Sequence, residues 1–561
     1  MTSFLLCVME KKQVYGLLVI WLVMNLVQAR FTNIQEDETY YYLYSLHLSW
    51  GYFDHPPFVA WIIRIGSWFF HDILKVRFVT VVLQPLTLGL IWHQLRFKSP
   101  VSQQQIIFFF LSAFVMVMFS VYGFITTPDA PLLFFTALFF FAYQQFLQKT
   151  DTATILIMIV SVTGLLYSKY QGILVVFFTV ASNKALFKKP AFYIIALSSL
   201  ILFLPHVYWQ FSHRFPSLQF HAVDRAEPFK WAYFLEYVPN QMLAFNPFIW
   251  IAAAYILVKY RYQDYYQRAL YYNIAGIFIV FWISTFRGHA EPHWTIVTAV
   301  PMLIAINEHL HEHTAFFKNI RKLLAFSAVL ILMLRVALIA GWVPEQLGFS
   351  AKPAYYQSIA RAAAHRPVIF ANNHIEPALY TYFTGDTAIS FPTLQNRKSQ
   401  FDIWNFQYNW LGKPAFCVGN YQGKASTYYA NGSIWYGFGT DSLYITQALH
   451  FNYTLPHTPI HQGDTLRIPF LLQNNGLQPY CLQSSDFSTV SGIVLVKAQQ
   501  YILLPNNNPL PQQCIAPQAS MQDTMYIAIP ALAKGNYQLT LYTGNCLGNT
   551  PNSKTMPVVI E

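Results

Sequence analysis

Four short polar motifs interrupt the long apolar stretches of the first 300 residues, and each holds side chains that can do chemistry. They are DETYY at 37–41 followed by GYFDHPP at 51–57, TTPDAP at 126–131, SKY at 168–170 and RGHAEPHW at 287–294. Ionisable residues beside membrane helices are costly and usually functional. A carboxylate can accept a proton from a hydroxyl group, whereas lysine and arginine can neutralise a phosphate. The motifs therefore predict a site for an anionic substrate at the lipid–water boundary.

Each acidic or basic residue of these motifs also has a purely structural explanation. Asp37 and Glu38 could start an interfacial helix at its positive end. Asp129 stands between two prolines, as helix N-terminal residues often do. Lys169 could extend to the interface like any long cation. The combination of all four motifs favours a functional site over four unrelated structural roles.

His289, Glu291 and His293 are residue types that bind zinc. However, the sequence has no HExxH motif, and Pro292 interrupts regular helical spacing between these residues. No CxxC pair suggests a metal site elsewhere. We therefore predict a reaction that needs neither a metal nor another cofactor.

The composition places much of the chain in a membrane. The 561 residues are 55% hydrophobic and only 11% charged, whereas soluble domains have about 25% charged residues. This composition excludes a cytosolic enzyme, a nucleic-acid binder and a disordered scaffold. The net charge of +11 then needs an explanation other than a nucleic-acid partner.

Apolar segments long enough for membrane helices occur only before Pro344. The sequence predicts about eleven spans, two of them uncertain. The segments lie near 14–30, 78–95, 105–124, 131–148, 152–168, 171–183, 191–209, 241–258, 269–286, 294–310 and 323–343. One uncertainty is that 152–183 could be two short helices broken at the SKY motif. The other is 191–209, which contains Pro205.

Positive charges alternate along the predicted loops, which predicts the orientation. The basic loops contain Lys11/Lys12, Arg96/Lys98, Lys149, Lys184/Lys188/Lys189, Lys259/Arg261/Arg268 and Lys318/Arg321/Lys322. Loops rich in lysine and arginine stay in the cytoplasm. The four polar motifs and everything after Pro344 should then face the exterior. Residues 1–29 also imitate a cleavable signal peptide, but a retained first helix keeps the alternation intact.

The region after Pro344 predicts a folded, water-exposed part with two subregions. Residues 345–435 combine a helical stretch at 355–364 with strand-like 367–371 and 414–418, which indicates a small α/β region. Residues 436–561 contain strand-like 465–472, 492–497, 525–529 and 536–542, which favour a β-sandwich. The predicted organisation is thus 1–344 in the membrane, 345–435 and 436–561.

Four of the five cysteines, Cys417, Cys481, Cys514 and Cys546, lie in this outer region. An oxidising compartment would permit disulfides between them. Four cysteines allow three pairings, and the sequence does not choose among them.

The four motifs, in this order, resemble the GT-C superfamily of polytopic glycosyltransferases, which use polyprenyl-phosphate sugars. The first motif is similar to the first-loop signature of bacterial lipid A aminoarabinose transferases and protein O-mannosyltransferases. The later motifs resemble those of the bacterial branch. The resemblance covers most of the first 310 residues. It implies a polyprenyl-phosphate donor and an active site on the extracytoplasmic face of a bacterial inner membrane.

The resemblance also implies roles for individual residues. It places Asp37 at the catalytic centre, with Asp129 as a second acidic group, and Lys169 near the donor phosphate. Beside Asp37, Glu38 is a further catalytic candidate. We expect Arg287 to help bind the phosphate. The remaining motif side chains are expected to contact substrates: Tyr52, His55, Tyr170, His289 and Glu291.

Two acceptor classes and one other function class stay open at this point. The acceptor could be an envelope lipid or glycan, or serine and threonine side chains of a protein. A transporter or flippase would need polar residues near the membrane midplane, where Arg335 is the main candidate. A transferase acting on an envelope lipid or glycan is the function that the motifs favour, because the charged motifs lie at one membrane face.

Overall fold

The structure is a computed structural model of the whole chain, and it divides into two compact units, Met1–Ala351 and Lys352–Glu561. The units are described separately. The structure describes residues 2–95, 101–309, 314–350, 352–370, 373–390, 393–394, 398–419, 421, 424–430, 432–455, 459–484, 486–497 and 500–561. The predicted basic loop at Arg96 and Lys98 lies outside these residues.

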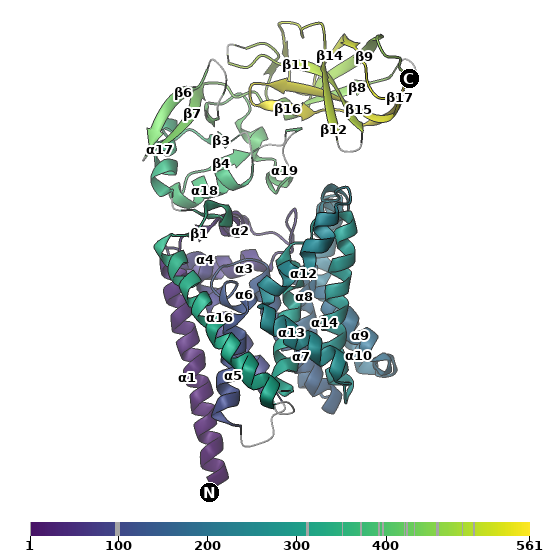
Figure 1. Cartoon of the computed structure of the whole chain (residues 1–561). Helices are drawn as coiled ribbons and strands as arrows, with labels where there is room; N and C mark the ends of the chain where they lie inside the picture. Colours follow the sequence, from purple (N-terminus) through teal and green to yellow (C-terminus); the bar gives the residue numbers. More distant parts are fainter. Residues whose placement is uncertain are drawn as a thin grey trace. The chain divides into compact units, whose positions relative to one another are not determined.

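The first unit is helical (Figure 1). Its longer helices are α1 (Thr2–Phe31), α2 (Glu36–Leu46), α3 (Phe58–Phe69), α4 (Leu74–Gln94), α5 (Gln103–Val115), α7 (Asp129–Gln148), α8 (Thr152–Ser168), α9 (Gly172–Ser182), α10 (Pro190–Ser212), α12 (Trp231–Phe245), α13 (Pro247–Lys259), α14 (Tyr265–Ser284), α15 (Ala299–Glu308) and α16 (Thr314–Ala340). Short helical turns include α6 (Val117–Ser120), α11 (Pro216–Gln219), η2 (Phe220–Asp224) and η4 (Pro292–Thr298).

Six helices among the described residues are long and apolar enough to cross a bilayer, and a bent pair raises this number to as many as seven. The six are Glu10–Phe31, Leu74–Gln94, Asp129–Gln148, Pro190–Ser212, Tyr265–Arg287 and Asn319–Ala340. Shorter apolar helices occupy Phe58–Phe69, Gln103–Val115, Thr152–Ser168 and Gly172–Ser182. The polytopic helical fold is confirmed, whereas the number of eleven spans stays a prediction.

Helices are interrupted within two of the predicted apolar regions, 152–183 and 241–258. The break at the SKY motif is confirmed, because α8 ends at Ser168 and α9 begins at Gly172. The segment predicted at 241–258 is bent rather than continuous, because α12 and α13 meet at Asn246 with a bend of 106°. That it forms one span stays a prediction. Pro247 has no N–H to continue α12, and the side chain of Asn246 instead caps α13 by accepting a hydrogen bond from the N–H of Phe248 at 3.0 Å.

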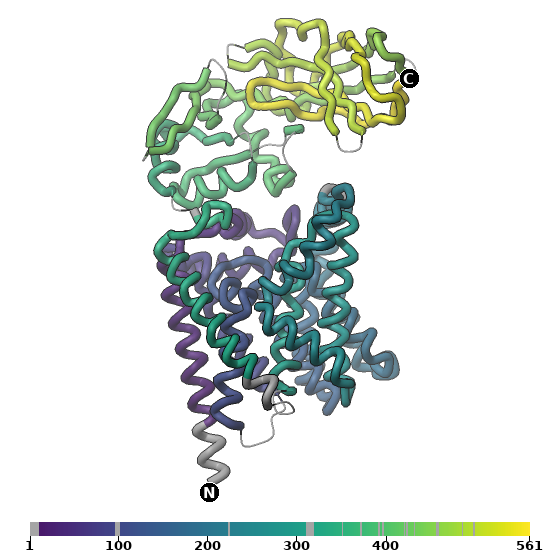
Figure 2. Tube along the Cα trace, in the orientation of Figure 1, coloured from purple at the N-terminus to yellow at the C-terminus, as the bar shows by residue number. Residues whose placement is uncertain are grey.

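A large apolar core lies inside the first unit. One continuous core of leucine, isoleucine, valine and aromatic side chains joins α4, α5, α7, α8, α14 and α15. Helices α1 and α16 lie side by side in both figures (Figures 1 and 2). Strand β1 (Ile34–Gln35) pairs with β2 (Phe349–Ser350), so the segment after α1 is held against the segment after α16.

The second unit begins with an α/β part (Figure 2, green). Its sheet has the order β4-β3-β5-β7-β6, with β3 parallel to both β4 and β5. The strands are β3 (Val368–Phe370), β4 (Ala388–Ser390), β5 (Ala415–Val418), β6 (Ser426–Ala430) and β7 (Ser433–Thr440), and the main helices are α17 (Pro353–Ala363) and α18 (Ile375–Thr384). The predicted helix and both predicted strands of this region are confirmed.

The rest of the second unit consists of antiparallel strands. They are β8 (Leu449–Tyr453), β9 (Thr465–Asn474), β10 (Tyr480–Cys481), β11 (Val490–Lys497), β12 (Gln500–Pro505), β13 (Cys514–Ile515), β14 (Ser520–Ala528), β15 (Gly535–Asn545), β16 (Gly548–Pro551) and β17 (Met556–Ile560). Side chains along β9 alternate between exposed and buried, as in a strand with one face on a core. The β-rich region is confirmed, and the boundary at residue 436 stays a prediction.

The structure contains one disulfide among the four cysteines of the outer region. Cys481 and Cys514 form a disulfide that joins β10 to β13. Cys417 is a buried thiol and Cys546 an exposed one.

Candidate active site

The first motif is anchored by a fully buried ion pair between Glu38 and Arg77. The Nε atom of Arg77 donates to both oxygens of Glu38, at 2.9 and 3.1 Å. Glu38 also accepts hydrogen bonds from the backbone N–H of Gln35 at 3.0 Å, which completes a capping box for α2, and from that of Thr126 at 2.9 Å. The carboxylate thus joins the first motif, α4 and the TTPDAP motif.

These bonds correct the role expected for Glu38. Its two oxygens are occupied by four donors, and the side chain is fully buried. Arg77 is equally committed, because it also donates to the carbonyl oxygens of Ala29, Thr32 and Asn33. The structure therefore favours Glu38 as a positioning residue rather than a catalytic one. The sequence signal for Arg77 was a charge at the start of an apolar helix, two residues after Lys75.

We expect Glu38→Gln to lower the free energy of unfolding by about 3–5 kcal/mol, because it leaves the buried Arg77 without its counter-ion. Thermal unfolding of the detergent-purified protein measures the effect. Glu36→Gln is the matched control, since Glu36 lies in the same helical turn but is only partly buried. Equal unfolding temperatures for both variants would contradict the anchoring role.

A second buried ion pair joins Asp129 to Lys169. The Nζ atom of Lys169 lies 2.8 Å from both carboxylate oxygens, and both side chains are nearly inaccessible. Asp129 is the first residue of α7, and Lys169 caps the end of α8 at the break of the SKY motif. The lysine ammonium has three donors, and within the described part of the chain both of its hydrogen bonds go to Asp129. The structure thus brings together two of the predicted motifs.

Three carboxylates from three segments surround Tyr41. Burial raises the pKa of Tyr41, and the negative charges of Asp37, Asp54 and Asp129 raise it further. Asp37 and Asp129 also interact electrostatically with Tyr122. Asp37 is the exposed one of these three carboxylates, whereas Asp54 and Asp129 are buried. Asp54 was missed as a candidate, although it belongs to the first motif, and it accepts a hydrogen bond from the Tyr44 hydroxyl at 2.8 Å.

Tyr52 is buried beneath the loop of the first motif and hydrogen-bonds to its backbone. It is fully buried, and its ring stacks on that of Tyr44 with centroids 4.0 Å apart. Its hydroxyl donates to the carbonyl oxygens of Tyr44 and His47, at 2.9 and 3.2 Å, and accepts from the N–H of Ser49. These contacts favour a structural role for Tyr52, and its substrate contact stays a prediction.

Three histidines near Lys169 are held in the neutral form. Burial, together with the charge of Lys169 and the neighbouring His221, lowers the pKa of His55 to about 3, although nearby carboxylates oppose this. Burial followed by the charges of Lys169 and Arg225 lowers the pKa of His293 well below its usual value. Burial likewise lowers the pKa of His221. The charge of Lys169 acts on all three neutral histidines, and that of Arg225 acts on His221 and His293. We call these two cations, together with the three neutral histidines, the cationic cluster.

The residues of the last motif differ in how they contact the cationic cluster. Glu291 forms ion pairs with Arg225 at 3.5 Å and with His289 at 3.8 Å. Arg225 also lies over the Trp294 ring, 4.7 Å from its centroid. Arg287, by contrast, is exposed and donates to the carbonyl oxygen of Ala222 at 3.2 Å. The structure therefore favours Arg225 over the predicted Arg287 as a phosphate partner.

An apolar pocket of 540 Å³ opens beside the cationic cluster. It is lined by Tyr170, Gln171, Ile173, Leu174, Phe203, His206, Val207, Gln210, Phe215, Ser217, Leu218, His221, Phe281 and Trp294. Its polar end is Tyr170, whose hydroxyl lies 3.1 Å from Nε2 of His206 and accepts from Gln210 at 2.8 Å. The rings of Tyr170 and His221 are 5.9 Å apart, and those of His221 and His55 are 6.4 Å apart. An apolar chain in this pocket would therefore present its head group to the cationic cluster.

No group of three or more His, Cys, Asp or Glu side chains among the described residues could hold a metal ion. Glu291 lies instead within ion-pair distance of both His289 and Arg225. That the reaction needs no metal stays a prediction.

Residues 54–209 match the family model described as dolichyl-phosphate-mannose-protein mannosyltransferase. The crystal structure of ArnT from Cupriavidus metallidurans in the apo state superimposes with a TM-score of 0.53 at 15% sequence identity, over 76% of this chain and 98% of ArnT. The chain has an ArnT-like GT-C fold. The same ArnT bound to undecaprenyl phosphate gives a TM-score of 0.54 at 13% identity, over 75% and 97% of the two chains. A search of curated protein sequences found no match.

The GT-C fold confirms the resemblance stated from the four motifs and makes the chain an integral membrane protein. The family model covers two of those motifs completely and begins within the first at Asp54. Asp37 and the last motif therefore lie outside the matched residues, and their roles rest on the geometry described above.

Proposed function

We propose that the chain is a membrane glycosyltransferase that moves a sugar from a polyprenyl-phosphate donor to an envelope lipid or glycan on the extracytoplasmic face. The observation that carries this proposal is the apolar pocket with the cationic cluster at its polar end. Its chemistry matches a donor with an isoprenoid tail and a phosphate head. The similarity to ArnT, which was crystallised with undecaprenyl phosphate, supports the same donor class.

The transfer step needs an activated acceptor oxygen and a stabilised leaving group. We assign Asp37 as the base that accepts the proton of the acceptor hydroxyl. Asp37 is exposed, whereas Asp54 and Asp129 are buried. The acceptor oxygen then bonds to the anomeric carbon while the bond from that carbon to the phosphate oxygen breaks. Lys169 and Arg225 would neutralise the charge that develops on the leaving phosphate. Asp129 holds Lys169 in place.

The neutral histidines can form hydrogen bonds with the sugar and phosphate oxygens of such a donor. Nδ1 of His55 is buried and has no hydrogen-bond partner in the described part of the chain. Buried polar atoms of this kind are rare in folded proteins and call for an explanation. A bound donor would supply the missing partner. Tyr170, His289 and Glu291 remain proposed substrate contacts around this position.

A second acceptor class is favoured by one finding. The matching family model describes protein mannosyltransferases, and serine or threonine hydroxyls would use the same base and the same leaving group. An acceptor assay that contains both envelope glycolipid and a serine- and threonine-rich peptide separates the two classes by the product that carries the labelled sugar.

The proposed location is a bacterial inner membrane, with the site and the second unit on the extracytoplasmic side. Reporter fusions after Lys98, Lys189 and Arg268 should be cytoplasmic, whereas fusions near Pro131, Pro228 and Glu561 should be external, because lysine and arginine remain inside. Paired phosphatase and fluorescent reporters measure both outcomes. A cytoplasmic signal at Glu561 would contradict this orientation.

A further inference from the structure

The α/β part of the second unit contains a pocket at the carboxyl ends of β3 and β5. The strand order β4-β3-β5 means that the chain leaves β3 toward β4 on one side and returns to β5 on the other. Such a reversal opens a crevice outside the carboxyl ends of parallel strands, where ligands of α/β sheets usually bind. The crevice between β3 and β5 is therefore a natural position for a ligand.

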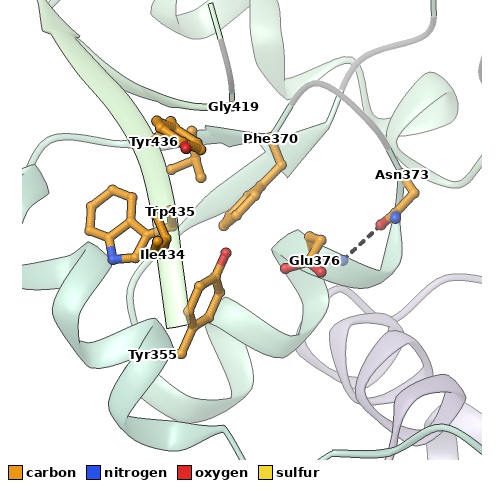
Figure 3. Close-up of a pocket in the computed structure, with 9 residues that line it drawn as sticks. Tyr355, Phe370, Asn373, Glu376, Gly419, Ile434, Trp435 and Tyr436 are labelled. Atoms are coloured by element: carbon orange, nitrogen blue, oxygen red, sulfur yellow. Dashed lines mark hydrogen bonds between the residues drawn. The ribbon is translucent and has the colours of Figure 1, made fainter. Parts of the chain in front are cut away.

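Aromatic side chains form the walls of this pocket. Tyr355, Phe370, Trp435 and Tyr436 line it, together with Val418 and Ile434. Figure 3 shows the Tyr355 hydroxyl and the Phe370 ring directed toward one another, from α17 and β3. The Trp435 wall is rigid, because its ring stacks on Tyr428 at 4.1 Å and its Nε1 donates to Ser358 at 2.9 Å.

Polar groups stand at defined places between these walls. Glu376 presents a carboxylate that is oriented by the Tyr356 hydroxyl at 3.1 Å. Asn373 uses its side-chain oxygen to accept from the N–H groups of Ile375 and Glu376, both at 2.9 Å (Figure 3). No described residue accepts a hydrogen bond from the Asn373 NH₂ group, so it remains a donor for a ligand.

Tyr355 adds a second donor to the same space. Burial, with a contribution from the charge of Glu376, raises the pKa of Tyr355 to about 12, so its hydroxyl keeps its proton at neutral pH. Within the described part of the chain this hydroxyl has no hydrogen-bond partner. A ligand that accepts from Tyr355 and Asn373 would give both donors a partner, and the same ligand could also donate to Glu376.

Size and charge restrict the class of ligand. The pocket volume is 270 Å³, slightly below the range of about 300–1,000 Å³ for drug-sized ligands. None of the described residues that line it is a lysine or an arginine, so a phosphate or another anion would face the Glu376 carboxylate without compensation. A small neutral molecule with an apolar face and several hydroxyl groups fits these limits.

We propose that this pocket binds a single neutral sugar ring of an envelope glycan. A pyranose has C–H groups on its faces, which pack on aromatic rings, and hydroxyl groups around its edge, which can pair with Glu376, Asn373 and Tyr355. The site belongs to the second unit and does not rest on the proposed transfer reaction. It gives the second unit its own place to hold a glycan.

Saturation-transfer NMR on the full-length protein in detergent tests this proposal. The probes are methyl β-D-glucopyranoside, methyl β-D-galactopyranoside, methyl α-D-mannopyranoside and methyl N-acetyl-β-D-glucosaminide, each without lipid donor. We expect saturation of the ring C–H protons of at least one probe. Tyr436→Ala should abolish that signal, while Tyr355→Phe and Glu376→Gln should each weaken binding about tenfold, because each removes or weakens one hydrogen bond but keeps the shape.

Tyr501→Ala is the matched control, since Tyr501 is an exposed tyrosine of β12, in a different sheet. No saturation transfer to any probe would overturn the proposal. A signal that persists in Tyr436→Ala but disappears in Asp37→Asn would also overturn it, because the sugar would then bind at the proposed active site. Loss of sugar transfer in Asp37→Asn with unchanged probe binding would leave the proposal intact, so the two sites are tested independently.

Discussion

Asp37→Asn should slow sugar transfer by about 100- to 10,000-fold, the usual contribution of a general base. Asparagine keeps the volume of aspartate, but it cannot accept the acceptor proton or carry a negative charge. Asp37 is exposed at the start of α2, so the change removes no buried ion pair. Expression and unfolding temperature should therefore stay close to those of the wild type.

Labelled sugar incorporated from a synthetic polyprenyl-phosphate donor into envelope extract measures this effect. Asp72→Asn is the matched control, because Asp72 is also an exposed carboxylate and pairs only with Arg30 at 2.9 Å among the described residues. If Asp37 merely stabilised the helix end, its loss would cost about 0.3–1 kcal/mol and leave turnover nearly unchanged. Near-normal incorporation by folded Asp37→Asn protein would remove Asp37 from the catalytic role and make Asp129 the next candidate.

Replacement of Lys169 should affect both stability and transfer. Lys169→Met leaves the Asp129 carboxylate buried without a counter-ion, which should lower the free energy of unfolding by about 3–5 kcal/mol. It also removes a positive charge that would stabilise the leaving phosphate. A loss of about 100- to 1,000-fold in transfer is typical when one such donor is removed.

The double variant Asp129→Asn/Lys169→Met separates these two effects. It removes both buried charges, so the unfolding temperature should recover much of the loss seen in the single variant. Transfer should remain at the low level of Lys169→Met, with a higher donor concentration needed for half-maximal rate, because Lys169 is expected to bind the donor phosphate as well. A stable double variant with wild-type transfer would show that the pair is only structural.

The local sequence was sufficient for elements that depend on neighbouring residues. The break between α8 and α9 follows from a polar SKY motif between two apolar stretches. The strands β9, β11, β14 and β15 follow from short β-rich runs between turn residues. The sequence predicted that Asp129 and Lys169 lie at the same membrane face, but it did not predict their ion pair.

The features that were missed depend on tertiary contacts. Arg77 stands just before the segment predicted near 78–95 and was not singled out, and its partner Glu38 lies 39 positions earlier in the chain. Arg225 was overlooked because its loop has no recognisable motif, whereas Arg287 was chosen because it adjoins one. The bend at Asn246 was missed because hydropathy averages over a window and does not register one proline. Long-range pairing of buried charges cannot be inferred from spacing alone.

The measurement that tests the account most directly is mass spectrometry of envelope lipids and glycans. Cells that lack the gene are compared with the same cells carrying the wild-type protein or Asp37→Asn. The account predicts a species heavier by one sugar residue that appears only with the wild-type protein, while the unmodified acceptor accumulates in the other two strains. Identical envelope profiles in all three strains, with the wild-type protein correctly inserted, would contradict the proposed glycosyl transfer.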